Sequence, residues 1–200
     1  MTNKVAERTV PTPCVAEVDR YLSEWDALES YVLQESSLTK LFVATYPQNT
    51  DIDEVLTKVA VLNDFYSTNI FKTYNVAKHI VALDIDARLT QGDDTLVNDI
   101  AFVDVGNGKT KSFYSFATKY CSHHKPLDYP IYDSFVDEVL RHFRKRDRFC
   151  RFRNDDLKKY GEFKRVLIEF QQFYGLEDFD LKKIDKYLWQ LGKEFFQKRY

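Results

Sequence analysis

Asp133 is the residue of this chain whose surroundings best suit chemistry. It follows a stretch interrupted by Pro126 and Pro130, and it precedes a helical stripe of apolar residues between Phe135 and Phe143. The spacing predicts that a helix begins at Asp133, where the unpaired backbone N–H groups favour negative charge. A carboxylate fixed in that position can stabilise positive charge that develops on a substrate.

Asp133 also has a purely structural interpretation. Aspartate is a common helix N-cap, and Ser134 followed by Asp137 has the spacing of a capping box. Taken alone, the local pattern favours the capping role. Capping and catalysis are nevertheless compatible at one residue, since both use the same fixed carboxylate.

The longer segment SFATKYCSHHKPLDYPIYDSFVDEVL, from Ser115 to Leu140, resembles the core of the helix-hairpin-helix DNA glycosylases. In that superfamily a hairpin leads into a helix, a proline-bearing connection follows, and an aspartate opens the next helix. The connection typically reads Pro-Val-Asp, and here Ile131, Tyr132 and Asp133 follow Pro130. The resemblance implies that Asp133 is the catalytic aspartate and faces a base-binding pocket.

The hairpin departs from the pattern of this superfamily. The usual Gly-x-Gly, whose amides hold a phosphate, aligns with Lys111 to Phe113, while Gly106 and Gly108 lie earlier and mark a turn. The resemblance therefore implies a shifted or altered hairpin. The archaeal 8-oxoguanine glycosylase branch is the nearest precedent for this departure.

Some members of the superfamily use a lysine that forms a Schiff base with the sugar. Its place early in the helix after the hairpin is taken here by Ser115, and the nearby candidates are Lys111 and Lys109. If neither lysine reaches the pocket, the resemblance implies the route in which water attacks and Asp133 assists.

Other residues are candidates for contact with DNA or with the extruded base. The resemblance places a duplex-entering turn at Ser67 to Asn69, with Tyr66 as a wedge; the alternative is an exposed polar turn at a helix end. The full set of candidates outside the basic run is Asn63, Tyr66, Ser67, Thr68, Asn69, Ser112, Ser115, His123, His124 and Tyr132.

A basic run from Arg141 to Arg153 concentrates positive charge. Seven Lys and Arg residues face one Asp there, a local charge of +6 in a chain whose net charge is −2. The pattern indicates phosphate contacts by Arg141, Arg144, Lys145, Arg146 and Arg148. The alternative is a solvated helix face with phenylalanines in the core.

The remaining reactive residues are sparse. Cys121, His123 and His124 lack a second Cys/His pair at zinc-ligand spacing, so no metal and no cofactor is expected. Three unevenly spaced cysteines argue against a disulfide framework. Trp189 lies on a helical apolar stripe and is expected to pack in the core.

Composition and periodicity favour helices. Glycine and proline are scarce, with 6 and 5 residues in 200, and the aromatic content is 16%. We expect an all-α fold of roughly seven to nine helices, in which residues 1–14 form a flexible arm. Residues 15–200 then form one domain, in which two helical lobes flank a cleft.

Together these features predict a DNA glycosylase that acts on a modified base flipped from duplex DNA, in base repair or in defence against phage. The alternative is a non-catalytic DNA-binding or protein-interaction module. No segment approaches the ~18 apolar residues of a membrane span, so we expect a monomeric cytoplasmic protein of a prokaryote or its phage, associated with the nucleoid when bound to DNA.

Overall fold

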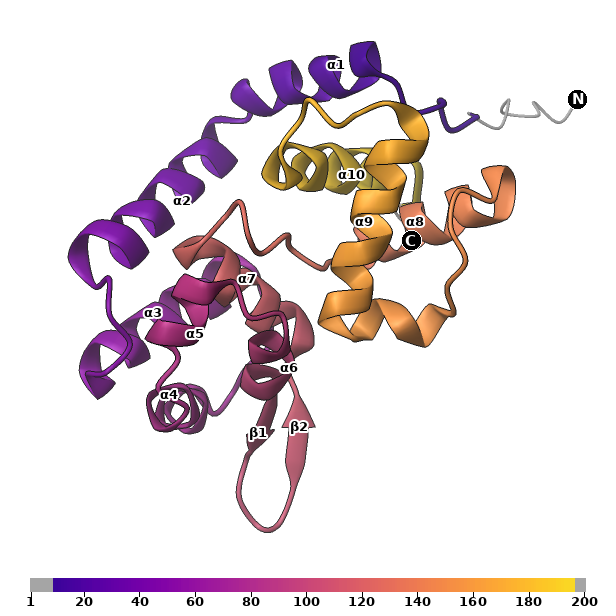
Figure 1. Cartoon of the computed structure of the whole chain (residues 1–200). Coiled ribbons are helices and arrows are strands. Elements are labelled where there is room, and N and C mark those ends of the chain that lie inside the picture. The colour runs from indigo at the N-terminus through magenta and orange to yellow at the C-terminus, as the bar shows by residue number, and fades with distance from the viewer. Residues whose placement is uncertain (1–8, 197–200) are drawn as a thin grey trace, which may run out of the picture.

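The computed structural model describes residues 9–196 and is mainly helical, as expected (Figure 1). The helices are α1 (Val15–Asp26), α2 (Glu29–Thr39), α3 (Ile52–Phe65), α4 (Thr73–Ala82), α5 (Asp86–Gln91), α6 (Thr95–Ala101), α7 (Tyr114–His124), α8 (Ser134–Asp147), α9 (Tyr160–Tyr174) and α10 (Leu181–Phe196). A π-helical segment, η1 (Lys40–Thr45), continues α2, and a 3-10 segment, η2 (Asn154–Lys158), precedes α9.

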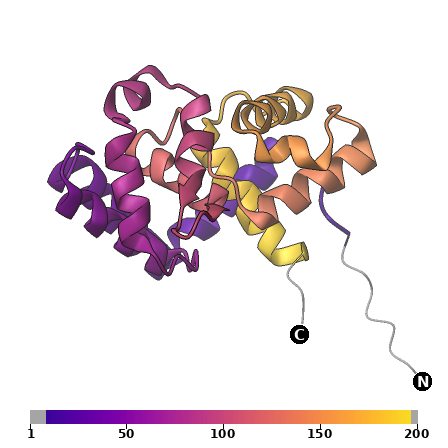
Figure 2. The ribbon, with the colours of Figure 1, turned by 90° about the horizontal axis from the view of Figure 1, so that it is seen from below.

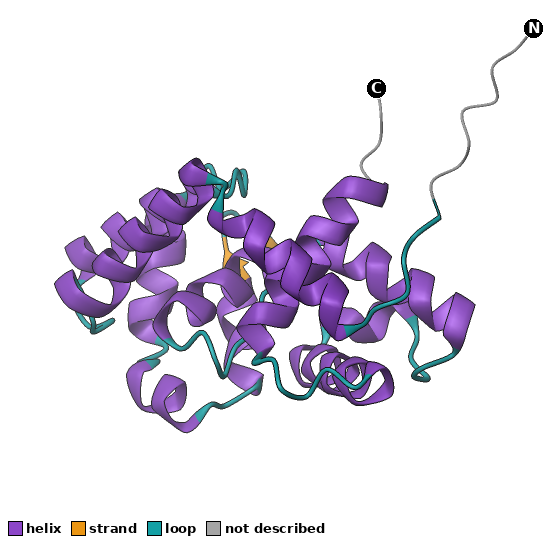
Figure 3. Cartoon of the chain, turned by 90° about the horizontal axis from the view of Figure 1, so that it is seen from above, coloured by secondary structure: helices purple, strands orange, loops and turns teal. Residues whose placement is uncertain are grey.

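A short antiparallel hairpin joins α6 to α7. Its strands, β1 (Phe102–Asp104) and β2 (Thr110–Ser112), pair Val103 with Lys111. The predicted turn at Gly106 to Gly108 is confirmed, because all three residues have positive φ angles that glycine and asparagine adopt readily. These two strands are the β-structure of residues 9–196, and loops and turns make up the rest of the non-helical chain there (Figure 3).

Helix boundaries follow local signals in most places. Gly92 and Gly175 each follow a stretch of helical apolar spacing, which predicts a helix end there, and they end α5 and α9 in the left-handed conformation. The spacing of apolar residues from Val76 to Gln91 predicts a single helix, but the chain breaks it at Asp84, whose φ is +47°. Such breaks raise the number of α-helices in residues 9–196 to ten, above the seven to nine predicted.

Two groups of helices lie side by side (Figure 2). One contains α3 to α7 with the hairpin, and the other contains α8 to α10. The N-terminal helix α1 packs on α10, and α2 contacts α3 and α7, so the first two helices link the groups (Figure 1). The connection from His124 to Asp133 crosses from one group to the other.

Close packing of α10 on α8 sets the position of the residue that opens α8. A Cβ atom added at Gly192 would lie 2.6 Å from Phe135 Cβ and 2.9 Å from the Phe135 carbonyl oxygen. Glycine therefore allows α10 to approach the first turn of α8, immediately after Asp133.

A buried polar network fixes α7 against α3. Asn49 Oδ1 accepts hydrogen bonds from Lys58 Nζ at 2.7 Å and from Tyr120 Oη at 2.6 Å, and His124 Nε2 lies 3.1 Å away. The Asn49 amide donates to Asp86. Burial lowers the pKa of Lys58 to about 8. The network therefore holds the middle of α7 around Tyr120 in place.

The described part of the N-terminal arm is docked. Arg146 donates hydrogen bonds to the Val10 carbonyl and to the Thr12 hydroxyl. Pro13 is buried. Residues 9–13 are thus anchored to α8 rather than free, whereas residues 1–8 of the predicted arm lie outside the described residues.

Candidate active site

A cavity of about 230 Å³ lies where the two groups of helices and α2 meet. Its lining residues come from α1, α2, α3, the α3–α4 loop, α7, α10 and the connection before α8. They are Trp25, Tyr31, Gln34, Glu35, Leu38, Phe65, Tyr66, Ser67, Lys119, Ile131, Asp133, Lys182, Asp185, Lys186 and Trp189. Its volume lies below the roughly 300–1,000 Å³ of sites for drug-sized ligands, which suits a small ligand.

Asp133 is the N-cap of α8, which confirms the predicted helix start. Its Oδ1 accepts a hydrogen bond from the Phe135 backbone N–H at 2.9 Å, and its backbone is extended. Its other oxygen, Oδ2, lies 3.6 Å from Lys119 Nζ. One carboxylate oxygen thus caps the helix while the other lies at a cavity that holds an amine.

Lys119 is the buried amine of this cavity. Its side chain is 4% exposed, and Nζ donates to Ser115 Oγ at 2.6 Å and to the Tyr132 carbonyl at 3.4 Å. Nζ also lies 5.1 Å from the centre of the Tyr66 ring. Burial lowers the pKa of Lys119, although the carboxylates of Asp133 and Asp185 oppose this effect. A lowered pKa increases the nucleophilic, neutral fraction of the amine.

Lys109 and Lys111, the lysines proposed from the sequence, do not line the cavity. Both are exposed on the hairpin, Lys109 beside the turn and Lys111 in β2. The lysine brought to Asp133 is Lys119, one helical turn after Ser115. The signal in the sequence is that Lys119 stands among the mostly apolar and small residues between Phe116 and Cys121, on a helix that is buried along most of its length.

Charged residues of α10 and α2 form the opposite wall. Asp185 is buried, and burial raises its pKa to about 7. Glu35 forms ion pairs with Lys186 at 2.7 Å and with Lys182 at 3.5 Å. Burial acts to raise the pKa of Glu35, but the two lysines outweigh it and lower the pKa. The cavity therefore combines a carboxyl that titrates near neutral pH with a firmly paired carboxylate.

An aromatic cluster closes one side of the cavity. The Trp189 ring lies 5.8 Å from Trp25 and 5.2 Å from Tyr31 between ring centres, both edge to face. Trp189 was expected to be a core residue, and it does pack against these rings. It also lines the cavity, where an aromatic ligand could stack.

The loop between α3 and α4 is rigidly braced. Asn63 Oδ1 accepts from Thr68 Oγ1 and from the Ile70 N–H, and Ser67 and Asn69 have positive φ angles. Asn63 and Thr68 therefore hold the loop in shape, and Ser67 lines the cavity.

Tyr66 points inward rather than outward. Its hydroxyl lies 3.0 Å from His123 Nε2, and its ring lines the cavity. The exposed aromatic residue of this loop is Phe71, which is 91% exposed. The predicted wedge position of Tyr66 is therefore corrected, because a ring packed against Lys119 and His123 cannot enter a duplex.

Three further candidates lie outside the cavity wall. His123 is buried beneath Tyr66, and His124 belongs to the Asn49 network. Burial lowers the pKa of His123 far below its usual value and that of His124 to about 3. Ser112 is exposed on β2. Direct substrate contact by the two histidines is therefore not supported, since both are buried behind the cavity as neutral side chains.

Tyr132 and Ser115 act beside Lys119 rather than on the cavity surface. The Tyr132 hydroxyl donates to Asp137 Oδ2 at 3.0 Å, while its carbonyl accepts from Lys119 and Ser115. Asp137 in turn pairs with Arg141. The connection before Asp133 is thereby fixed from both α7 and α8.

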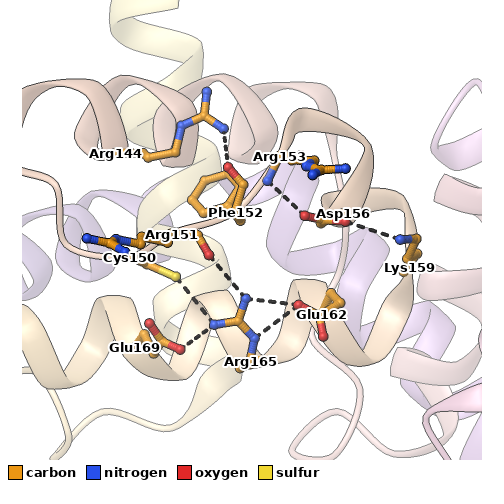
Figure 4. Close-up of polar contacts among 10 residues, drawn as sticks. All are labelled: Arg144, Cys150, Arg151, Phe152, Arg153, Asp156, Lys159, Glu162, Arg165 and Glu169. Atoms are coloured by element: carbon orange, nitrogen blue, oxygen red, sulfur yellow. Dashed lines mark hydrogen bonds and ion pairs between the residues drawn. The ribbon is translucent and has the colours of Figure 1, made fainter.

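The basic run has two kinds of cation. Arg141 pairs with Asp137, Arg144 donates to the Phe152 carbonyl, and Arg146 pairs with Asp147. Figure 4 shows how Arg144 is used within the protein, together with Arg165, which spans Glu162 and Glu169 on α9. These arginines hold the α8–α9 region together.

Three other cations of the run are available to a ligand. Lys145, Arg148 and Arg151 have exposed side chains without a hydrogen-bond or ion-pair partner among residues 9–196. Arg148 also ends α8 in the left-handed conformation, with φ of +57°. Of the five cations proposed for phosphate contact, Lys145 and Arg148 are thus free, and Arg151 joins them.

The described residues contain neither a cluster of metal ligands nor a membrane-spanning helix. In the range 9–196 no group of three or more His, Cys, Asp and Glu residues is arranged to hold a metal ion. No helix within that range has the length and apolar character to cross a membrane. Cys14, Cys121 and Cys150 are free thiols.

Comparison with known proteins gives a family for the chain. Residues 17–128, from α1 to the connection after α7, match the family HI_0787_N, described as an N-terminal domain. An uncharacterized protein of Haemophilus influenzae is 52% identical over 151 residues, which are 75% of this chain and 72% of that protein. The chain belongs to this family. No solved structure matches it.

Proposed function

We propose that this protein is a DNA glycosylase of the helix-hairpin-helix class, which removes a damaged or modified base from duplex DNA. The observation that carries the proposal is the buried Lys119 amine, held 3.6 Å from the Asp133 carboxylate in an aromatic-lined cavity. Lys119 is the nucleophile and Asp133 its electrostatic partner. This assignment replaces Lys109 and Lys111.

The chemistry follows from these two groups. Neutral Lys119 Nζ attacks C1′ of the sugar and forms an N–C1′ bond, while the glycosidic bond breaks and the base leaves with the bonding electrons. The proton that Lys119 loses on becoming neutral balances the one that the base takes up. Asp133 stabilises the positive charge that develops on the sugar. One of the two hydrogens left on the nitrogen then moves to the ring oxygen as the C1′–O4′ bond breaks, and the sugar ring opens to a protonated imine with a free 4′-hydroxyl.

The cavity and its surroundings support an extruded base as the ligand. An enzyme that acts on a base within a duplex must flip it into a pocket, where aromatic rings stack on it. Trp189 and Tyr31 supply such rings. Phe71, on the loop that also contributes Ser67 to the cavity, would occupy the space left in the base stack. Lys145 and Arg148 would contact phosphates further along the DNA.

The order of elements is a second line of support. Helix α6, the hairpin, helix α7, an extended connection with Pro130 and the Asp133 cap of α8 follow one another as the resemblance implies. Here the hairpin is made of two short strands with a five-residue turn from Val105 to Lys109.

Borohydride trapping tests the proposal. Duplexes that carry 8-oxoguanine, uracil, alkylated or hypermodified bases are incubated with the protein, and abasic sites and covalent protein–DNA adducts are measured. We expect base release from at least one duplex and an adduct with the wild-type protein. Lys119→Gln should abolish the adduct, and the matched hairpin variant Lys111→Gln should retain it.

The outcomes separate the alternatives. An adduct that persists in Lys119→Gln and disappears in Lys111→Gln would return the nucleophile to the hairpin. Base release without any adduct would assign the water route. Duplex binding with no base release from any substrate would instead identify a non-catalytic DNA-binding module.

A further inference from the structure

We infer that Ser115 is a positioning residue that orients the Lys119 amine and sets its protonation. Its role as a positioning residue in catalysis rests on the proposed function, but its effect on the amine does not. The sequence indicated Ser115 as a substrate contact, and it does not line the cavity. Its contacts lie with Lys119 and with the connection before Asp133.

The contact with Lys119 is the shortest that the amine makes. Ser115 Oγ lies 2.6 Å from Nζ, compared with 3.4 Å for the Tyr132 carbonyl and 3.6 Å for Asp133 Oδ2. Ser115 and Lys119 are one turn apart on α7, so they share a face of the helix. The shortest hydrogen bond of this buried amine is therefore the one to a neutral hydroxyl from its own helix.

The hydroxyl proton of Ser115 is already committed. Ser115 Oγ donates to the Tyr132 carbonyl at 3.2 Å, and so its oxygen accepts from Lys119. The Tyr132 N–H donates to Thr118 Oγ1 at 3.2 Å, and the Tyr132 hydroxyl donates to Asp137. Because the carbonyl is fixed from two helices, the direction of the Ser115 hydroxyl is fixed as well.

This arrangement leaves one position on Nζ for chemistry. The Ser115 oxygen and the Tyr132 carbonyl each take one amine hydrogen, whether Lys119 is charged or neutral. The third position then lies on the side of Asp133 and the cavity. It holds a hydrogen in the ammonium form and the lone pair in the neutral form. If the hydrogen bond to Ser115 were lost, the Lys119 amine could rotate and turn its lone pair away from the substrate.

The protonation effect has a definite sign. Ser115 Oγ accepts a stronger hydrogen bond from an ammonium than from an amine. Removing it should therefore lower the pKa of Lys119 further. The charged and titratable groups that face Lys119 are Asp133 at the N-cap of α8, Asp185 and Lys182 of α10, Tyr66 of the α3–α4 loop and His123 of α7 itself. None of them is altered by a change at Ser115.

The test follows the Lys119 amine in the DNA-free full chain by NMR of ¹⁵N-labelled lysine across a pH titration. Lys119→Gln assigns the signal. In Ser115→Ala we expect the Nζ titration to move down by about one pH unit, the scale of a hydrogen bond to a charged group. Ser115→Thr keeps a hydroxyl and should restore the wild-type midpoint.

Ser122→Ala is the matched control. Ser122 is buried on the same helix, and its hydroxyl has no hydrogen-bond partner among residues 9–196. Its replacement by Ala should leave the Lys119 titration unchanged. An identical midpoint in Ser115→Ala and the wild type would overturn the inference, and so would an equal shift in Ser122→Ala.

A kinetic measurement separates this inference from the proposed function. Single-turnover base release is measured against pH on a duplex that the wild type cleaves. In Ser115→Ala the acid limb should move to lower pH and the plateau should fall about tenfold, roughly the loss of one oriented hydrogen bond. Unchanged kinetics in this variant would overturn the catalytic positioning role of Ser115 and would leave the proposed function standing. If the wild type releases no base, the proposed function fails, while the NMR titration still decides the role of Ser115.

Discussion

Asp133 shows that one side chain in this protein has both a structural and a chemical role. Asp133 caps α8 through one carboxylate oxygen and approaches Lys119 with the other. Substitutions can separate these two roles because asparagine caps helices about as well as aspartate but carries no charge.

Asp133→Asn should therefore keep the stability and lose the activity. We expect the free energy of unfolding to stay within about 1 kcal/mol of the wild type, since the cap remains. Base release should fall at least ~100-fold, the scale of losing a charge-stabilising group. Asp133→Ala should lose both, with a further destabilisation of about 1 kcal/mol. Denaturant unfolding and single-turnover assays measure the two effects, and unchanged turnover in Asp133→Asn would remove the carboxylate from the mechanism.

Asp185 should make stability depend on pH. Its pKa rises from an ordinary 3.8 to about 7 on burial, so the folded state holds a proton between these values that the unfolded state has lost. Stability conferred by this proton is present below about pH 4 and is lost as pH rises to 7. At pH 8 the wild type must bury an ionised Asp185 carboxylate, and Asp185→Asn removes that cost. The melting temperature of the variant relative to the wild type should therefore be several °C higher at pH 8 than at pH 4.

The comparison of variant with wild type is needed because other groups titrate in the same range. His123 and His124 are buried in the neutral form, and their lowered pKa values reduce stability as pH falls below about 6.5. That contribution is common to both proteins and cancels in the difference. An equal difference at pH 4 and pH 8 would contradict a buried, proton-binding Asp185.

Elements, rather than isolated residues, determine how DNA would meet the protein. The braced α3–α4 loop carries Phe71 outward, and the distal end of α8 carries cations that the protein does not use. Helix α8 spans 14 residues, and at ~1.5 Å per residue it separates Asp133 from this basic end by roughly 20 Å. Contacts at both ends would cover about six base pairs at ~3.4 Å each.

Phe71→Ala should weaken base extrusion without affecting the fold. The side chain is 91% exposed, so its loss should change the free energy of unfolding by less than ~0.5 kcal/mol. Fluorescence of 2-aminopurine placed next to the modified base reports extrusion, and we expect a reduced signal change on binding. Phe173→Ala, at a 51% exposed position on α9, is the control. Equal effects of the two variants would exclude a special role for the loop.

The free cations should set the salt dependence of duplex binding. Replacing Lys145, Arg148 and Arg151 by Gln should reduce the slope of log K against log salt by up to ~2.7, at about 0.9 per phosphate contact. Fluorescence anisotropy at several salt concentrations measures it. Arg144→Gln should mainly reduce stability, because Arg144 binds the Phe152 carbonyl. An unchanged slope in the triple variant would show that these three cations do not contact DNA phosphates.

At the scale of the whole molecule, the site depends on how two groups of helices meet. The cavity takes residues from both groups and from α2, and the fit of α10 against α8 holds the start of α8 in place. Gly192 is the position where this fit is tightest.

Gly192→Ala should therefore disturb both fold and site. The added Cβ would lie 2.6 Å from Phe135 Cβ and close to its backbone, and such overpacking typically costs about 1–3 kcal/mol. Because Phe135 N–H is the cap partner of Asp133, base release should fall as well. Gly161→Ala is the control, since its nearest neighbour would be 3.9 Å away. Equal stability of the two variants in denaturant unfolding would contradict this packing.

Local rules accounted for much of the fold and for part of the site. The helical class, the turn at Gly106 to Gly108 and the N-cap at Asp133 follow from short-range periodicity, backbone preference and capping chemistry. The break at Asp84 was missed, because an apolar pattern can continue through a residue that the tertiary fold turns into the left-handed region.

The sequence by itself determined where Asp133 stands in its helix and that the cations cluster after it. The tertiary structure alone decided which lysine meets Asp133, since Lys119 and the hairpin lysines are all near in sequence but only Lys119 lies on the buried face of α7. It also decided that Tyr66 is turned inward and that Asp185 lies across the cavity from Lys119 and Asp133. These placements depend on the packing of α7 and α10, which are far apart in sequence, and local patterns do not encode such long-range contacts.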